Sequence, residues 1–93
     1  MKYEFEGIVF EWRGPAPFYF VETPRDVAAQ IDEIKSSLTY GWGVIPVRVT
    51  IGEIETSTSI IPKNGSYYVP LKEAIRKPNA IQVGDLVKIQ LAL

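Results

Sequence analysis

The architecture is decided by one stretch of the chain, which reads SYYVPLKEAIRKPNAIQVGDLVKIQL at residues 66–91. Its aromatic and β-branched beginning is typical of a short strand. Pro70 fits the start of a helix, which we expect over 71–77, and Pro78 ends it. A Gly-Asp turn follows, and the alternating apolar residues after it predict a final strand. The stretch therefore predicts a strand, a short helix, a turn and a strand in succession.

A hairpin is predicted before this stretch. Apolar and polar residues alternate over 47–51 and again over 54–60, as in strands that bury one face. Gly52 and Glu53 separate the two runs, and a two-residue loop with glycine first favours a type II′ turn. The two runs are therefore expected to pair with each other.

The first strand, 2–12, is expected to contain a bulge. Tyr3 and Phe5 share one face, whereas the apolar residues from Ile8 onward have the opposite parity. A change of parity means that one extra residue must be absorbed, and Gly7 lies where the parity changes. A bulge at Gly7 would bend the strand, as closure of a small barrel requires.

The longer helix is predicted over 24–38, after a short aromatic strand at 18–21. Thr23 is a candidate N-cap, and Pro24 fits the first helical position. Apolar residues spaced four, three and four apart form one stripe, which should cover an open end or a face of the sheet. These residues are Val27, Ile31, Ile34 and Leu38.

The predicted elements follow one order twice: strand, strand, helix, strand. Two copies are too few for a solenoid. We therefore expect residues 1–93 to form a single, mainly β domain, a small closed barrel of the double-split type with about six strands and pseudo-two-fold symmetry. Chance similarity between two amphipathic segments is the alternative to a duplication.

Cysteine and histidine are both absent from the 93 residues. Their absence excludes disulfides, Cys/His zinc sites, thiol catalysis and histidine-based triads. No apolar run approaches the roughly 20 residues that a membrane-spanning helix needs, and the N-terminus lacks the layout of a signal peptide. The expected localisation is cytoplasmic, with no membrane association.

The deciding stretch also resembles a known family. Residues 68–77 read YVPLKEAIRK, and residues 80–89 read AIQVGDLVKI. Together they look like the signature of the AbrB/MazE-type double-split β-barrels, in which a strand, Pro, Lys-Glu, Arg, Gly-Asp and a strand follow one another. The resemblance implies a barrel built by two swapped chains, and DNA binding through basic residues.

A second resemblance extends over most of the chain. It rests on Phe5 to Trp12, the segments 17–24, 56–58, 65–67 and 75–77, and Gly84-Asp85. These residues are similar to a family of uncharacterised small β-barrel domains, which in other proteins occur alone or joined to bacteriocin-protection domains of the OmpD-associated type. The resemblance implies a monomeric or weakly associating barrel with both halves on one chain, and it implies no activity.

Three basic residues are candidates for contact with an anion or a nucleic acid. Lys72 and Arg76 are four apart and share a face of the predicted short helix, and Lys77 follows them. If three cations contact phosphates, the logarithm of the binding constant changes with the logarithm of the salt concentration with a slope of about −2.7. Such binding is weak unless a dimer doubles the site. Since the net charge is −1, no broad field attracts nucleic acid.

Two aromatic residues are candidate anchors for a ligand or a partner. Tyr40 and Trp42 are followed by Gly41 and Gly43, and an exposed aromatic side chain in such a segment can anchor a partner. Packing over a barrel end is the alternative for Trp42.

We therefore expect a non-catalytic binding or interaction module without cofactor or metal. The acid pairs, Asp32-Glu33 and Glu53/Glu55, have the character of solvated surface rather than of a catalytic site. The alternative is an AbrB-like nucleic-acid-binding protein that uses the helix 71–77. The expected partners are a second copy of the chain or another protein, with nucleic acid as the weaker expectation.

Overall fold

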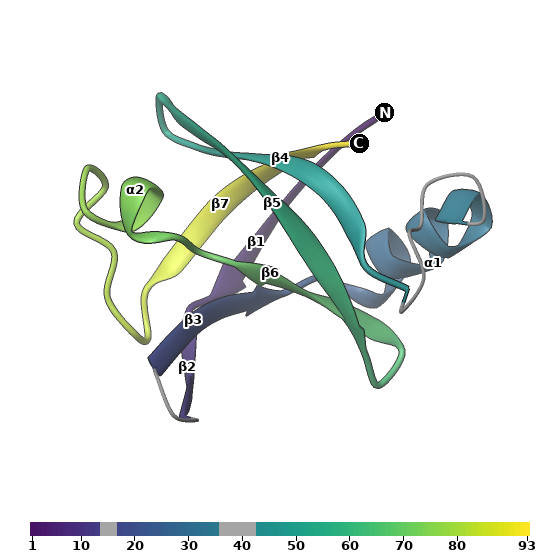
Figure 1. Cartoon of the computed structure of the whole chain (residues 1–93), viewed down its shortest axis with the longest axis horizontal. Helices are drawn as coiled ribbons and strands as arrows, with labels where there is room; N and C mark the ends of the chain where they lie inside the picture. The colour runs from purple at the N-terminus through teal and green to yellow at the C-terminus, as the bar shows by residue number, and fades with distance from the viewer. Residues whose placement is uncertain (14–16, 36–42) are drawn as a thin grey trace.

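Seven strands of the described chain form one antiparallel sheet, accompanied by two helices (Figure 1). The structure is a computed structural model that describes residues 1–13, 17–35 and 43–93. The strands are β1 (Lys2–Ile8), β2 (Phe10–Arg13), β3 (Pro17–Glu22), β4 (Ile45–Ile51), β5 (Ile54–Lys63), β6 (Ser66–Pro70) and β7 (Leu86–Ala92). The helices are α1 (Arg25–Ile34) and α2 (Glu73–Arg76). Neither described helix has the length and apolar character needed to cross a bilayer.

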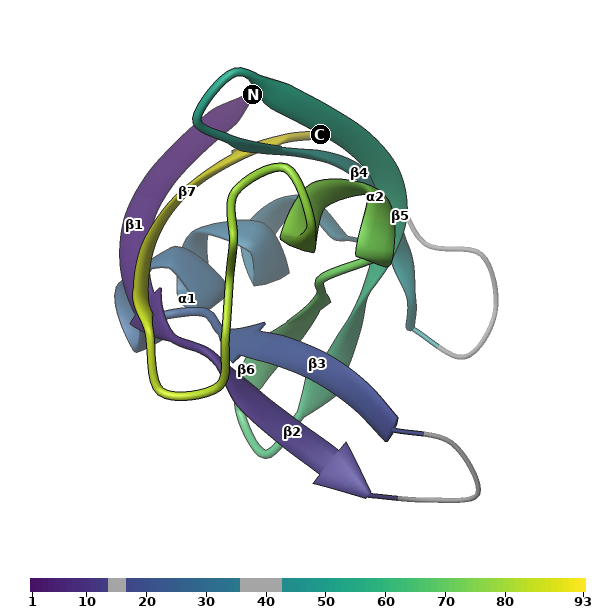
Figure 2. The same cartoon turned by 90° about the vertical axis from the view of Figure 1, so that its left-hand side faces the viewer.

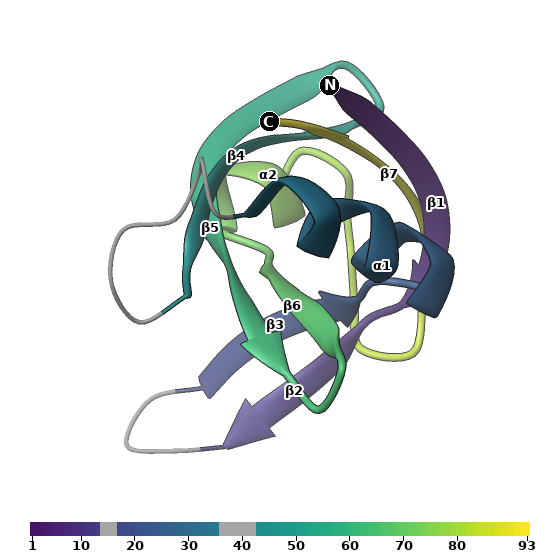
Figure 3. The same ribbon diagram turned by 90° about the vertical axis from the view of Figure 1, so that its right-hand side faces the viewer.

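The sheet is open, so the closed six-stranded barrel expected from the sequence is wrong. The strand order is β1-β7-β4-β5-β6-β3-β2, which leaves β1 and β2 as the two edges. The sheet curls into a half-barrel, as Figures 2 and 3 show from two sides. Closure would need β1 and β2 to pair, but a single residue, Val9, separates them. One residue is too short a connection for the reversal that antiparallel pairing requires.

The predicted first strand is divided at Val9 rather than bulged at Gly7. Gly7 stays in regular register with Val87 of β7, so the expected bulge does not form there. The Val9 amide instead donates to the Asp85 carbonyl at 2.9 Å, and the Gly84 amide donates to the Val9 carbonyl at 2.8 Å. These two bonds hold the change of direction from β1 to β2.

Gly7 is needed for a different reason. A Cβ atom at this position would overlap Val21 Cγ1 of β3. The two ends of the curled sheet therefore pack closely where β1 crosses β3, although they are not paired. Val21 is fully buried at this contact.

The core lies on the concave side of the half-barrel. Alternation along each strand places every second residue there, as the buried positions Ile45, Val47, Val49 and Ile51 of β4 show. The helices lie at opposite ends of the half-barrel (Figure 1). α1 contributes Val27, Ala28 and Ile31 to the core.

α1 is shorter than the predicted helix 24–38, and residues 36–38 lie outside the described residues. Thr23 is not an N-cap, because the helix starts after Pro24 without a side-chain cap. The Thr23 hydroxyl instead accepts a bond from the Tyr67 amide at 3.0 Å, and the Thr23 amide donates to the Tyr67 carbonyl at 2.9 Å. Thr23 therefore joins the start of α1 to β6.

α2 lies inside the predicted helix 71–77 but has only the four residues Glu73–Arg76. The element types from β2 to β4 recur from β5 to β7 as two strands, a helix and a strand. This order agrees with the predicted one, while descent of the two halves from one duplicated segment stays a prediction.

Candidate ligand-binding surface

The convex side of β2, β3 and β6 carries a cluster of aromatic rings. Alternation places Tyr19, Val21, Tyr67 and Val69 toward the core, so their neighbours in the strands face outward. The antiparallel register aligns the outward residues, since Phe10 is opposite Phe20 and Trp12 is opposite Phe18. We call this surface the aromatic face, and it consists of Phe10, Trp12, Phe18, Phe20 and Tyr68.

The rings of the aromatic face contact one another in a chain. The centroid of the Tyr68 ring lies 5.0 Å from that of Phe10, edge to face, and 5.6 Å from that of Phe20. Phe18 joins the chain through Phe20 at 6.3 Å, and it contacts Trp12 at the same distance. Such ring pairs are stabilising by about 0.5–1.5 kcal/mol each beyond the burial of area. The rings therefore support one another as a rigid surface.

The face is exposed at its outer end. Trp12 is 54% exposed and Phe18 is 49% exposed, whereas Phe20 is only 7% exposed because the other rings cover it. Ile61 of β5 pairs with Tyr68 and extends the apolar surface onto the next strand at 37% exposure. Large exposed apolar side chains that adjoin one another are typical of interaction sites.

A groove of about 160 Å³ runs between the rings. It is lined by Trp12, Phe20, Ile61, Lys63 and Tyr68. The described residues offer no hydrogen-bond partner to the Trp12 indole N–H, the Tyr68 hydroxyl or the Lys63 ammonium. The groove therefore combines an apolar floor with polar groups that are available to a ligand.

The predicted basic group is only partly brought together. Lys72 donates to the Ser57 carbonyl, and the Arg76 Nε donates to the Leu71 carbonyl at 2.9 Å. The Arg76 guanidinium also lies 4.1 Å from the centroid of the Tyr19 ring. Lys72 and Arg76 line one groove of about 380 Å³ beside α2, and Glu73 also lines that groove.

Lys77 does not line the groove beside α2. Its ammonium lies 2.6 Å from Glu73 Oε1, and this hydrogen bond lowers the pKa of Glu73 below its ordinary value. Each of the three predicted cations thus has a contact within the protein. Their proposed role in anion or nucleic-acid binding stays a prediction.

The second predicted site falls outside the structure. Tyr40 and Trp42 are not among the described residues. Sequence reasoning did not find the aromatic face, because the face depends on the pairing of β3 with β6. A signal was present in the sequence, since Phe10 and Trp12 have the opposite parity to Phe5 and Val9, which are buried in the core.

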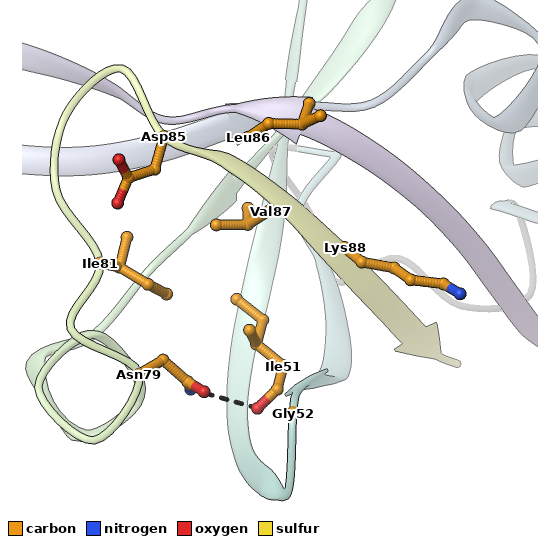
Figure 4. A pocket seen from close by; sticks show the side chains of 8 residues that line it. All are labelled: Ile51, Gly52, Asn79, Ile81, Asp85, Leu86, Val87 and Lys88. Carbon is orange, nitrogen blue, oxygen red and sulfur yellow. Dashed lines mark hydrogen bonds between the residues drawn. The ribbon is translucent and has the colours of Figure 1, made fainter.

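A third groove, of about 360 Å³, lies between the β4–β5 turn and the segment before β7 (Figure 4). The Asn79 amide nitrogen bridges its two sides, because it donates to the Ile51 carbonyl at 3.1 Å and to the Ile75 carbonyl at 2.9 Å. The Asp85 carboxylate accepts a bond from the Gln82 amide at 2.8 Å, which stabilises the turn predicted before the final strand. The polar groups of this groove are thus used to hold the fold.

The acid pairs do not converge on one point. Within the described residues no three acidic side chains lie close enough to hold a metal ion. Glu55 Oε1 lies 2.5 Å from Arg48 Nη1 on the convex side of the sheet, and Asp32 accepts a bond from the Tyr67 hydroxyl. Both predicted acid pairs therefore contribute a side chain to a contact that stabilises the fold.

A comparison with protein families gives one match. The model of a family described as a domain of unknown function, DUF1905, matches residues 5–91. No curated protein matches the chain. The family match spans every strand that builds the aromatic face.

Proposed function

The chain belongs to the DUF1905 family of domains of unknown function, and we propose that it is a non-catalytic binding module for an extended, proline-rich segment of another protein. The aromatic face is the binding surface. The observation that carries the proposal is the groove between Trp12, Ile61 and Tyr68, which joins exposed rings to donors that have no partner among the described residues.

The size of the groove favours a side chain over a whole small molecule. Pockets for small molecules usually measure about 300–1,000 Å³. The groove measures about 160 Å³ and is open along the sheet. It therefore suits one apolar side chain of a longer segment, which continues over Phe18 and Phe20.

The polar groups of the groove favour a proline-rich segment. The Trp12 indole and the Lys63 ammonium can only donate hydrogen bonds, and the Tyr68 hydroxyl can also donate. A polyproline II segment has no internal hydrogen bonds, and its prolines lack N–H groups. Its backbone carbonyls are therefore free to accept hydrogen bonds from the protein. Aromatic grooves in other recognition domains use this preformed conformation because little entropy is lost on binding.

Nucleic acid is the alternative ligand, through the helix 71–77 that the sequence singles out. Among the described residues, Lys63 is the one cation that lines the groove of the aromatic face. The basic residues beside α2 are held by Ser57, Leu71 and Glu73. Breaking these contacts would offset part of the gain from phosphate binding, so the geometry supports a peptide ligand better.

Calorimetric titration with a proline-rich peptide tests the proposal. Trp12→Ala and Ile61→Lys should each weaken binding about tenfold or more, since anchors of this kind usually contribute more than 1 kcal/mol. Leu86→Ala is the matched control, because Leu86 is 60% exposed but lies in β7, which is not a strand of the aromatic face, and does not line the groove. Equal loss of affinity in all three variants, or no binding at millimolar peptide, would overturn the proposal.

The same protein should be titrated with single-stranded DNA at low salt. Binding that disappears when Lys72, Arg76 and Lys77 are changed to alanine, together with no peptide binding, would establish the nucleic-acid alternative instead.

A further inference from the structure

The β2 strand has a free edge beside the aromatic face. β2 is the last strand in the sheet order, and β3 is its one partner among the described residues. Figures 2 and 3 show the β2–β3 hairpin extending from the body of the half-barrel, with the other edge of β2 turned away from it. Free edges offer unpaired backbone groups, and proteins usually shorten, charge or pair them.

The side chains of β2 allow very few ways of pairing with a second copy. In a continuous antiparallel sheet, opposed residues must lie on the same face. A two-fold axis perpendicular to the sheet keeps the aromatic faces of both copies on one side. The axis must then lie midway between the two copies of one β2 residue. Glu11 and Arg13 are then opposite residues of the concave face, and Trp12 is opposite a residue of the convex face.

The charges of β2 select one of these registers. Centring on Glu11 or on Arg13 places like charges opposite each other, which is destabilising. Centring on Phe10 places Glu11 opposite the partner's Val9, which is buried and lies outside β2. Centring on Trp12 places Glu11 opposite the partner's Arg13, and Arg13 opposite the partner's Glu11. This register also places Trp12 opposite the partner's Trp12, as an aromatic pair across the axis.

We infer that two copies of the chain pair through β2 in the register centred on Trp12, forming one sheet with a continuous aromatic face. In the single chain, Glu11 and Arg13 already form an ion pair at 3.1 Å, and Arg13 is 88% exposed. In the dimer, Glu11 pairs with the partner's Arg13 instead of with its own, so both charges still have a partner of opposite sign. The interface is isologous, because the same strand serves both copies.

The dimer goes beyond the proposed peptide binding and does not compete with it. Ile61 and Tyr68 lie on β5 and β6, which β3 separates from the paired edge. Trp12 also lines the groove and would lie at the paired edge, while the side of the groove formed by Ile61 and Tyr68 would stay open in both copies. A dimer would present two grooves on one surface, so that a repetitive ligand gains from a high effective concentration at the second groove.

Charge exchange tests the register directly. Glu11→Lys alone places the new lysine opposite the partner's Arg13, and Arg13→Glu alone places two acids opposite each other. Each variant should dimerise about tenfold more weakly than the native chain in light scattering. An equimolar mixture should restore dimers, because every opposed pair is then of opposite charge. Glu53→Lys is the matched control, since Glu53 is an exposed acid in the β4–β5 turn.

A cysteine experiment gives a second measurement that does not depend on charge. The native chain has no cysteine, so one introduced thiol is the only one present. Trp12→Cys should form an intermolecular disulfide under mild oxidation, because residues on the axis lie opposite each other. Phe18→Cys is the control, because Phe18 is similarly exposed but lies on β3.

The two experiments have outcomes that contradict the inference. A native chain that is monomeric up to millimolar concentration overturns it. So does a dimer that resists both charge variants, or equal crosslinking at positions 12 and 18. Peptide binding would be unaffected by these results, since one copy contains a complete groove.

Discussion

The Tyr67 hydroxyl donates a hydrogen bond to Asp32 Oδ1 at 2.5 Å, which ties β6 to α1 at the end of the half-barrel. Tyr67 is 2% exposed, and its backbone also pairs with Thr23. Lys35 lies 3.8 Å from the same carboxylate oxygen. This hydrogen bond therefore helps the Thr23 backbone contacts and the apolar residues of α1 to hold the helix over the core.

Loss of the Tyr67 hydroxyl should loosen this connection. We expect Tyr67→Phe to lower the free energy of unfolding by about 1–2 kcal/mol, since a hydrogen bond to a charged group is lost while the ring stays buried. Urea denaturation would measure the change. Tyr3→Phe is the control, because the Tyr3 hydroxyl contacts only the sulfur of Met1 within the described residues, and it should change stability by less than about 0.5 kcal/mol.

Tyr67 should also make the fold sensitive to alkali. Burial, followed by the hydrogen bond to Asp32, raises the pKa of Tyr67 well above its ordinary value of 10.0. The folded state therefore holds this proton more tightly than the unfolded state. The resulting stability is present below pH 10.0 and is lost as the pH rises from there toward the folded pKa.

Thermal denaturation across this alkaline range would check whether stability falls as the pH rises. The native chain should lose stability more steeply above pH 10.0 than Tyr67→Phe does. Parallel curves for the two proteins would show that Tyr67 titrates alike in the folded and unfolded states, against the expectation.

Even one added methyl group at position 7 should destabilise the fold. We expect Gly7→Ala to cost about 1–3 kcal/mol, because the added methyl group overlaps Val21 Cγ1 in a fully packed contact. The double variant Gly7→Ala, Val21→Ala should cost less than the sum of the two single variants, since removal of the valine methyls makes room. Additive costs in equilibrium unfolding would argue against the close approach of β1 and β3.

Asn79 should be a larger contributor to stability than its exposed neighbours. Its amide donates to the Ile51 and Ile75 carbonyls, so Asn79→Ala leaves two partly buried acceptors without that donor. We expect a loss of about 1–2 kcal/mol in denaturant unfolding. Gln82→Ala serves as the control, because Gln82 is exposed and the structure uses its backbone amide in the turn. Similar losses in both variants would contradict the bridging role.

Local patterns in the sequence predicted the elements well. Alternation located the β4–β5 hairpin, whose Gly52 has the positive φ of 62° that the glycine-first turn favours. The stretch around Pro70 and Gly84-Asp85 also formed the predicted strand, short helix and turn. These features depend on neighbours in the chain, so propensity and turn chemistry were enough.

Long-range relationships were harder to predict. The expected change of parity at Gly7 is wrong, because Phe5 and Val9 are both buried and share one parity, whereas Ile8 is 54% exposed. The sequence alone also did not show that the strand would divide between the two edges of the sheet. Pairing of β1 with β7 joins residues from the two ends of the chain, and no local pattern specifies such a pairing. The aromatic face was missed for the same reason, because it requires β6 to lie beside β3 and to bring Tyr68 onto Phe10 and Phe20.

Peptide recognition by the aromatic face is tested most directly by following individual side chains in an NMR titration with a proline-rich peptide. The indole N–H of Trp12, assigned with Trp12→Phe, and the ring protons of Tyr68 should shift progressively and saturate, with amide shifts confined to β2, β3, β6 and the adjoining end of β5. Resonances of Lys72 and Arg76 serve as the internal control and should stay in place. Shifts that gather around α2, or unchanged Trp12 and Tyr68 resonances at millimolar peptide, would contradict the assignment of this surface.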